Sequence, residues 1–92
     1  MTAAAEHRPR VTLYGRAECH LCDEAREALA ELRSQGLEFD VAEVDIESDD
    51  ALLRSHLERI PVVEVDGKEV SELIFDEKAF RTALASIGSL RA

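Results

Sequence analysis

The stretch VTLYGRAECHLCDEA (residues 11–25) joins a strand-like run to a helix-like pattern, and it holds both cysteines of the chain. Residues 10–15 form a β-branched and aromatic run that ends at Gly15, which is typical of a buried strand. The sequence therefore predicts a strand, a short loop and then a helix that begins beside Cys19. From His20 onward the apolar residues repeat as one helical face, at Leu21, Ala25, Ala28, Leu29 and Leu32.

The segment after this helix predicts a second strand. Gly36 fits the C-terminal cap of the helix, because glycine readily adopts the conformation that ends one. Residues 37–46 then alternate between apolar and polar side chains, as a strand does. The alternation slips between Val41 and Val44, which predicts a bulge or only partial pairing of this strand.

A second helix and a hairpin follow. Ser48 is the expected N-cap of the helix, and Pro61 ends it because a residue before proline is pushed toward extended conformations. Residues 61–75 contain two apolar-rich runs on either side of Asp66-Gly67, a preferred pair for a type I′ turn. The buried stripe of the helix is predicted to be Leu53, Leu57 and Ile60.

The last pattern is a helix that Asp76 can cap, and its inner face is predicted at Phe80, Leu84 and Ile87. The order is then β-α-β-α-β-β-α. The first β-α-β unit should be parallel and right-handed, and the hairpin adds two antiparallel strands. The sequence thus predicts an α/β fold in which a four-stranded mixed sheet lies between helices, as a three-layer sandwich.

Length and charge limit the possible functions. The 92 residues make one domain, with a disordered tail expected over 1–9 and the folded domain over 10–92. A net charge of −9 disfavours nucleic acid as a partner, because phosphates attract clustered Lys and Arg. No apolar window is long enough to span a membrane. The start MTAAAEHRPR has no apolar signal core, so we expect a cytoplasmic protein without a membrane partner.

The pair Cys19 and Cys22 predicts redox chemistry. Residues at i and i+3 are neighbours on a helix, at a distance that a disulfide tolerates. The helix N-terminus stabilises a thiolate at Cys19, and Arg16 and a protonated His20 would add to this. Three carboxylates oppose them, from Glu18, Asp23 and Glu24. We expect Cys19 to attack a substrate disulfide and Cys22 to resolve the mixed disulfide.

Two other classes of function remain open for the same cysteines. A zinc or iron–sulfur protein would need further ligands, and only His7, His20 and His56 could join the thiols unless a second chain or a borrowed ligand completed the site. A chain with an occasional disulfide or idle thiols could instead be an interaction module. Lasting disulfides are rare in the cytoplasm and two cysteines are too few for a disulfide framework, so redox chemistry is preferred.

Two motifs in this order resemble the glutaredoxin-like branch of the thioredoxin superfamily over residues 10–90. VTLYGRAECHLCDEA resembles the first strand and active-site helix, and RIPVVEVDGKEV (59–70) resembles the cis-proline loop and hairpin. The resemblance implies a thioredoxin-like fold, with Cys19 as nucleophile and Cys22 as resolving thiol. It also implies a cis Ile60-Pro61 bond that faces the dithiol. There the Ile60 main chain would pair with an extended substrate.

The chain departs from this family at several positions. His20 replaces the proline that usually follows the first cysteine of glutaredoxins. Leu21 stands where strongly oxidising relatives carry histidine before the second cysteine. The glutathione-binding Gly-Gly turn is replaced by Ser71 and Glu72, which would crowd and repel glutathione, although Arg16 matches a basic glutathione-binding position. Ile74 and Phe75 follow where acidic residues are expected.

The combined prediction is a monomeric thiol–disulfide oxidoreductase without a bound cofactor or metal. Its substrates would be protein disulfides, and its electrons would come from an upstream reductase or a low-molecular-weight thiol, with glutathione disfavoured. Arg16, His20, Ile60 and Pro61 are the predicted substrate contacts. Tyr14 is expected to pack in the strand and His56 to lie on a polar helix face, while Arg59 is expected to be a surface charge.

Overall fold

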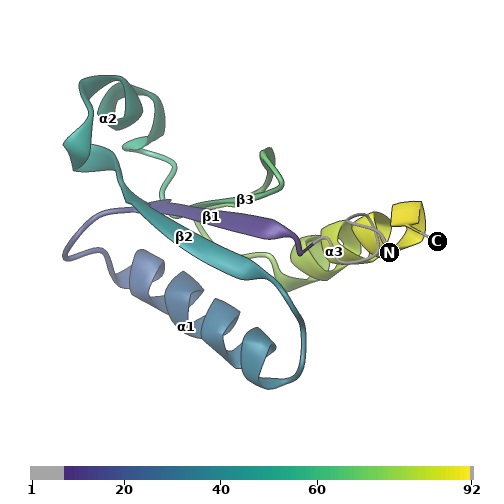
Figure 1. Ribbon diagram of the computed structural model, residues 1–92. Coiled ribbons are helices and arrows are strands. Elements are labelled where there is room, and N and C mark those ends of the chain that lie inside the picture. Colours follow the sequence, from purple (N-terminus) through teal and green to yellow (C-terminus); the bar gives the residue numbers. More distant parts are fainter. Residues whose placement is uncertain (1–7, 92) are drawn as a thin grey trace.

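The computed structural model describes residues 8–91, and the side chains of residues 8–87. It contains the predicted succession of elements, shown in Figure 1. The strands are β1 (Arg10–Gly15), β2 (Asp40–Asp45), β3 (Val62–Val65) and β4 (Lys68–Glu72). The helices are α1 (His20–Ser34), the short 3₁₀ turn η2 (Ile46–Ser48), α2 (Asp50–His56) and α3 (Glu77–Arg91).

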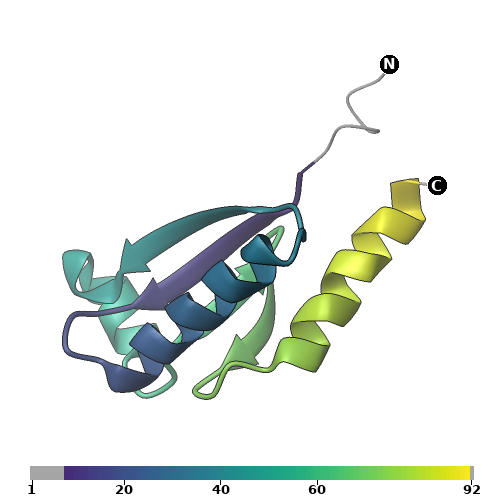
Figure 2. The same cartoon turned by 90° about the horizontal axis from the view of Figure 1, so that it is seen from below.

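The four strands form one mixed sheet in the order β2-β1-β3-β4. β1 pairs with β2 in parallel and with β3 in antiparallel orientation, and β3 pairs with β4 as the predicted hairpin. Helices α1 and α3 lie side by side on one face of the sheet, and α2 lies on the other (Figures 1 and 2). The predicted three-layer architecture, with a thioredoxin-like order of elements, is therefore confirmed.

The main core lies between the sheet and the α1–α3 layer. Phe39, which follows α1, and Phe80 of α3 are fully buried, and their rings meet edge to face with centroids 5.2 Å apart. Burying one such ring contributes about 1.5–3 kcal/mol. The other buried members of this core are Val11, Leu13, Ala25, Leu29, Leu32, Val63 and Val65. As predicted, Leu84 and Ile87 of α3 pack against it.

The expected bulge in β2 is wrong. β2 pairs with β1 without irregularity, from Arg10 opposite Asp40 to Gly15 opposite Asp45. Val41 packs on the α1–α3 core, whereas Val44, three residues on, points to the opposite face because side chains alternate along a strand. Both valines are half-buried since both faces of the sheet are covered, so the slip in the pattern needs no bulge.

The one register shift in the described part of the sheet lies in the hairpin, between Val63 and Glu64. The hairpin turn itself is as predicted. Asp66 and Gly67 both have positive φ, of 51° and 85°, as a two-residue type I′ turn requires.

The predictions for the second helix are wrong at both of its ends. Ser48 lies in η2, and its Oγ donates a hydrogen bond to the Asp45 carbonyl. The N-cap is Asp49, whose Oδ1 accepts hydrogen bonds from two backbone N–H groups of the first turn, at 2.8 and 3.1 Å. The helix ends at His56, so Ile60 is not part of it, and Leu57 is 43% exposed rather than buried. Of the predicted stripe, Ile60 is nevertheless buried, and Leu53 packs against the cluster that contains it.

The other predicted caps are confirmed. Gly36 follows α1 with φ 102°. Asp76 precedes α3, and its Oδ1 accepts a hydrogen bond from the Ala79 amide at 3.0 Å. Of the expected tail, residues 1–7 lie outside the described part of the chain. Arg8 pairs with Asp40 at 3.2 Å, and the Pro9 carbonyl accepts a hydrogen bond from the Asp40 amide, so these two residues are attached to β2.

Within residues 8–91, no helix combines the length and the apolar character that crossing a membrane demands.

The turn at Gly67 provides a test of the hairpin. No heavy atom lies within 4 Å of a Cβ built at this position, so Gly67→Ala changes only the backbone preference. We expect Gly67→Ala to lower the free energy of unfolding by about 1 kcal/mol, because alanine disfavours the left-handed region. Gly67→Asn should cost less than half as much, since asparagine visits this region more readily. Equal losses in urea titrations of the two variants would contradict this account.

Candidate active site

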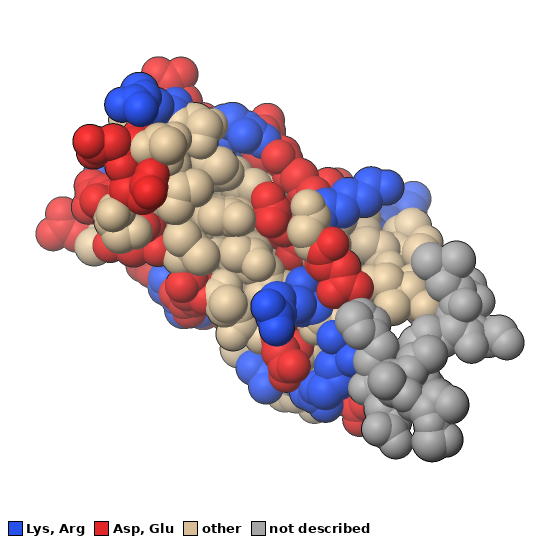
Figure 3. All heavy atoms as spheres, turned by 45° about the horizontal axis from the view of Figure 1, so that its top comes forward, with Lys and Arg blue, Asp and Glu red and all other residues tan. Residues whose placement is uncertain are grey.

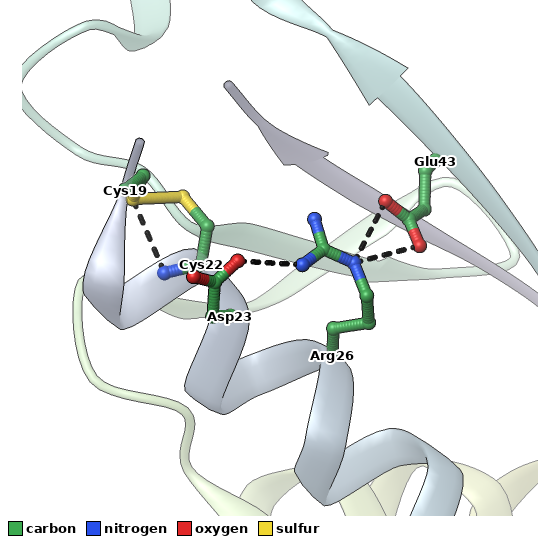
Figure 4. Close-up of polar contacts among 5 residues, drawn as sticks. All are labelled: Cys19, Cys22, Asp23, Arg26 and Glu43. Atoms are coloured by element: carbon green, nitrogen blue, oxygen red, sulfur yellow. Dashed lines mark hydrogen bonds and ion pairs between the residues drawn. A yellow bond between two sulfur atoms is a disulfide. The ribbon is translucent and has the colours of Figure 1, made fainter. Parts of the chain in front are cut away.

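Cys19 lies at the end of the loop that joins β1 to helix α1. It is the N-cap residue of α1, and its Sγ accepts a hydrogen bond from the backbone N–H of Cys22 at 3.1 Å. The two cysteines form a disulfide with their Cα atoms 5.2 Å apart (Figure 4). Cys19 is half-buried and Cys22 is fully buried, so the two sulfurs differ in access to solvent. A sulfur at the N-cap lies in the positive field of the helix, which favours a thiolate there.

The Cys22 side chain packs against the end of β1, at Gly15. A Cβ built on Gly15 would lie 3.0 Å from the Cys22 Sγ and 3.2 Å from its Cβ, which is too close for ordinary packing. Gly15 has no positive φ, so glycine is needed here for space and not for conformation. Ile46 and Ile60 close the rest of this small buried cluster around Cys22.

The Ile60-Pro61 peptide bond is cis, as the resemblance implied. Pro61 is fully buried, and the Ile60 side chain packs in the cluster that contains Cys22 and borders Cys19. The Pro61 carbonyl accepts a hydrogen bond from the Leu73 amide at 2.9 Å. Within the described residues, neither the amide nor the carbonyl of Ile60 has a hydrogen-bond partner. A free main-chain edge therefore lies next to the dithiol.

The two side chains expected to support a Cys19 thiolate are each paired with a carboxylate. The guanidinium of Arg16 lies 3.6 Å from Glu47, and the His20 ring lies 3.0 Å from Glu24. Both pairs are exposed to solvent, where such contacts contribute little. The remaining favourable interaction at the Cys19 sulfur is the one with the helix N-terminus.

Arg26 links the first turn of α1 to strand β2 of the sheet. Arg26 contacts Asp23 at 2.7 Å and Glu43 of β2 at 2.9 Å (Figure 4). These hydrogen bonds, the one to Glu43 first, raise the pKa of Arg26 above its usual value, so its charge is fixed. Arg16 and Gly15 join these three residues around a cavity of about 370 Å³ beside the dithiol helix.

The end of the molecule that carries α2 is acidic. Figure 3 shows carboxylates gathered at this end, and η2, α2 and their caps supply Asp45, Glu47, Asp49 and Asp50. In Figures 1 and 2 the β1–α1 loop, which leads to Cys19, lies at this same end. A ligand that approaches the dithiol therefore meets a negative field, which disfavours an anionic substrate.

The segment after β4 borders the cis-proline loop. Arg59 forms hydrogen bonds with both Glu69 and Glu72, the latter at 2.7 Å, and the bond from Arg59 is the main reason that the pKa of Glu69 is lowered. Arg59 is a surface charge as predicted, but its guanidinium is already paired with these two glutamates of the same chain. Leu73 has φ 65° and Ile74 is 73% exposed. Sequence reasoning noted Ile74 and missed Leu73, whose backbone conformation no side-chain pattern indicates.

Tyr14 contacts His56, and it packs against the same small cluster of Cys22, Ile46 and Ile60 that Cys19 borders. The Tyr14 and His56 rings are 4.7 Å apart, and the Tyr14 hydroxyl donates a hydrogen bond to Glu64 at 3.3 Å. Burial first, and Glu64 second, raise the pKa of Tyr14, which keeps it neutral. His7 lies outside the described residues. Among residues that are described, no group of three or more His, Cys, Asp or Glu side chains could hold a metal ion.

Comparison with known proteins supports the resemblance. Residues 10–85 match the family model described as glutaredoxin-like domain (DUF836). The chain is 37% identical over 83 residues to the uncharacterized protein Rv0508 of Mycobacterium tuberculosis, which covers 85% of this chain and 84% of that protein.

Two solved structures give the same fold. The X-ray structure of protein XcR50 from X. campestris is 38% identical, with a TM-score of 0.67 and coverage of 83% of this chain and 96% of that one. A mutant thioredoxin of Halobacterium salinarum shares 22% identity at a TM-score of 0.60, over 89% of this chain and 76% of its own. At this identity the thioredoxin shows similarity of fold alone.

The contact between Gly15 and Cys22 predicts a redox-dependent effect of Gly15→Ala. In the disulfide the Cys22 sulfur is held at both ends and cannot move away from an added Cβ, whereas a reduced thiol can rotate. We expect the variant to destabilise the oxidised protein by about 1.4 kcal/mol relative to the reduced one, within the usual range of overpacking. That difference raises the reduction potential by about 30 mV, measurable by equilibration in redox buffers.

A double-mutant cycle provides the control for this prediction. In a Cys22→Ala background the sulfur is gone, so Gly15→Ala should cost much less unfolding free energy than it does in the oxidised parent. An unchanged potential, or an equal cost in both backgrounds, would show that Gly15 does not position Cys22.

Proposed function

The chain belongs to the glutaredoxin-like domain family, and we propose that it is a thiol–disulfide oxidoreductase acting on protein disulfides through Cys19 and Cys22. One observation carries the proposal. A half-buried sulfur accepts a hydrogen bond from an N–H in the first turn of a helix, and its partner is buried one turn further along the same helix. An N-cap sulfur is suited to nucleophilic attack, and a buried neighbour is suited to resolving an adduct before solvent reaches it.

The reaction needs no group beyond the two thiols and the substrate. The Cys19 thiolate attacks one sulfur of a substrate disulfide, forming a mixed disulfide and releasing the first substrate sulfur as a thiolate that takes up a proton. Cys22 then loses its proton and attacks the Cys19 sulfur. The second substrate thiol leaves, the Cys19–Cys22 disulfide forms, and two electrons have moved from protein to substrate. The same steps in reverse oxidise a substrate dithiol.

The Ile60 main chain is the proposed docking edge for the substrate. Its unpaired amide and carbonyl can form two hydrogen bonds to an extended polypeptide, as when a strand joins the edge of a sheet. Pro61 holds this edge beside the sulfurs and adds no N–H that would compete for the substrate. Arg16 and His20 are the other proposed substrate contacts, and contact with a substrate would require each to leave its carboxylate partner.

Glutathione is disfavoured as the reductant. The turn that would bind it carries Ser71 and Glu72 in place of glycines, and the neighbouring Arg59 is occupied by Glu69 and Glu72. A tripeptide with two carboxylates therefore meets added side chains and an unfavourable charge. We propose that a reductase or a different small thiol returns Cys19–Cys22 to the dithiol state, with the protein acting as a monomer in a reducing compartment such as the cytoplasm.

Cysteine variants test the proposed function. The reduced wild-type protein should convert 2-hydroxyethyl disulfide to its thiol, with one protein disulfide formed for each pair of thiols released. Cys19→Ser should reduce the rate to the uncatalysed background, because Cys22 is buried and cannot replace it. Mass spectrometry of Cys22→Ser should show a stable mixed disulfide at Cys19. Retention of the reaction by Cys19→Ser would refute the proposed roles.

The same preparation tests the competing metal-protein class. Protein purified under reducing, anaerobic conditions should contain zinc and iron well below one atom per chain, and it should titrate as two free thiols per chain. Stoichiometric metal together with blocked thiols would favour a metal-binding protein over an oxidoreductase.

A further inference from the structure

The turn between β4 and α3 presents apolar side chains to solvent. Leu73 is 43% exposed and Ile74 is 73% exposed, the most exposed large hydrophobic residue in the described part of the chain. Exposed apolar side chains of this size usually have a binding role when they border a site.

The backbone of this turn is fixed by several hydrogen bonds. The Leu73 amide donates to the carbonyls of both Arg59 and Pro61, each at 2.9 Å. Ser71 is 7% exposed, and its Oγ donates to the Ile74 carbonyl at 3.2 Å and accepts from the Asp76 amide at 3.1 Å. These contacts hold Leu73 in the left-handed region, at φ 65°, which is unfavourable for a leucine. Strain that the surroundings impose in this way is typical of functional sites.

The turn is joined directly to the dithiol site. The Pro61 carbonyl that holds Leu73 belongs to the residue after Ile60, and Ile60 packs with Cys22 and borders Cys19. The Leu73 amide is thus bonded to the residues on either side of Ile60, which brings Leu73 and Ile74 within reach of a polypeptide that pairs with the free Ile60 main chain.

The charges around the turn select against acidic ligands. Arg59 is held by Glu69 and Glu72, whose two negative charges outweigh its single positive charge and leave little attraction for a carboxylate of the substrate. Glu72 precedes Leu73 and Asp76 follows Ile74 closely, and both are exposed. An acidic side chain at this position would lie close to these carboxylates and to apolar groups.

From these contacts we infer that Leu73 and Ile74 determine substrate specificity by binding an apolar side chain of an extended polypeptide next to the disulfide that Cys19 attacks. The inference rests on the proposed oxidoreductase function and names its substrate class. The substrate is a polypeptide with an uncharged, apolar residue beside its cysteine, and an acidic residue at that place is rejected.

Two synthetic peptides test the inference with the full-length, pre-reduced protein. Each contains one intramolecular disulfide, flanked by leucine in one peptide and by glutamate in the other. In single-turnover measurements the wild-type protein should reduce the leucine peptide about 10-fold faster or more, as burial of one leucine side chain allows. Ile74→Ser should lower the rate for the leucine peptide and shrink the ratio toward about 2, and circular dichroism should show an unchanged fold.

An added positive charge at position 74 should give a gain of function that misfolding cannot produce. Ile74→Lys should raise the rate for the glutamate peptide above that of the wild-type protein. Leu57→Lys is the matched control, because Leu57 is as exposed as Leu73 and lies outside the turn, and it should leave both rates within about 2-fold of wild type. Equal wild-type rates for the two peptides would overturn the inference, and so would an equal gain with the glutamate peptide in Leu57→Lys. Failure to reduce either peptide or 2-hydroxyethyl disulfide would instead remove the proposed function itself.

Discussion

The packing of the Cys22 sulfur against the end of β1 is the contact on which the site depends. Gly15 leaves room for that sulfur, and with the sulfur in place the first turn of α1 lies directly against the sheet. Cys19, one turn earlier, is then held at the N-cap and at the boundary between core and solvent. The contact that buries the Cys22 sulfur therefore also places the Cys19 sulfur nearer to solvent. The unequal solvent access of the two thiols follows from this one close contact.

The second half of the domain adds the surface on which we propose that a substrate binds. The hairpin β3–β4 brings the cis-proline loop to the dithiol, and the turn after β4 is bonded back to that loop through the Leu73 amide. Arg59, which precedes the loop, reaches Glu69 and Glu72 on β4. Loop, strand and turn are therefore one connected unit, so a change in the turn acts at the same edge where the chemistry occurs.

Sequence reasoning predicted the elements whose causes are local. The strand before Cys19, the helix after it, the Asp66-Gly67 turn and the Asp76 cap each follow from residues that are neighbours in the chain. The cis bond before Pro61 came from the family resemblance and not from propensity, because most such bonds are trans. Predictions failed where tertiary packing decides: the pattern of β2 reflects two covered faces, which a one-sided template mistakes for a bulge.

The pairing of charged side chains was the feature that the sequence predicted least well. Arg16 and His20 stand on either side of Cys19 in the chain, which suggested that they support its thiolate, but the fold supplies each with a carboxylate partner. A pairing such as that of Arg26 with Glu43 crosses from α1 to β2, so no local pattern reveals it.

The departures from the family pattern are consistent with one another in the structure. Ser71, in place of a glycine, is buried and supplies the hydrogen bonds that hold the turn. That rigidity sustains Leu73 in a conformation that glycine would adopt without cost and leucine does not. Ile74 then projects into solvent where the family pattern expects an acidic residue. A loss of glutathione-binding residues alone would leave the turn free to vary, whereas here the replacements cooperate to build a fixed apolar surface beside the dithiol. The physical argument therefore favours a site adapted to polypeptides over a degraded glutathione site.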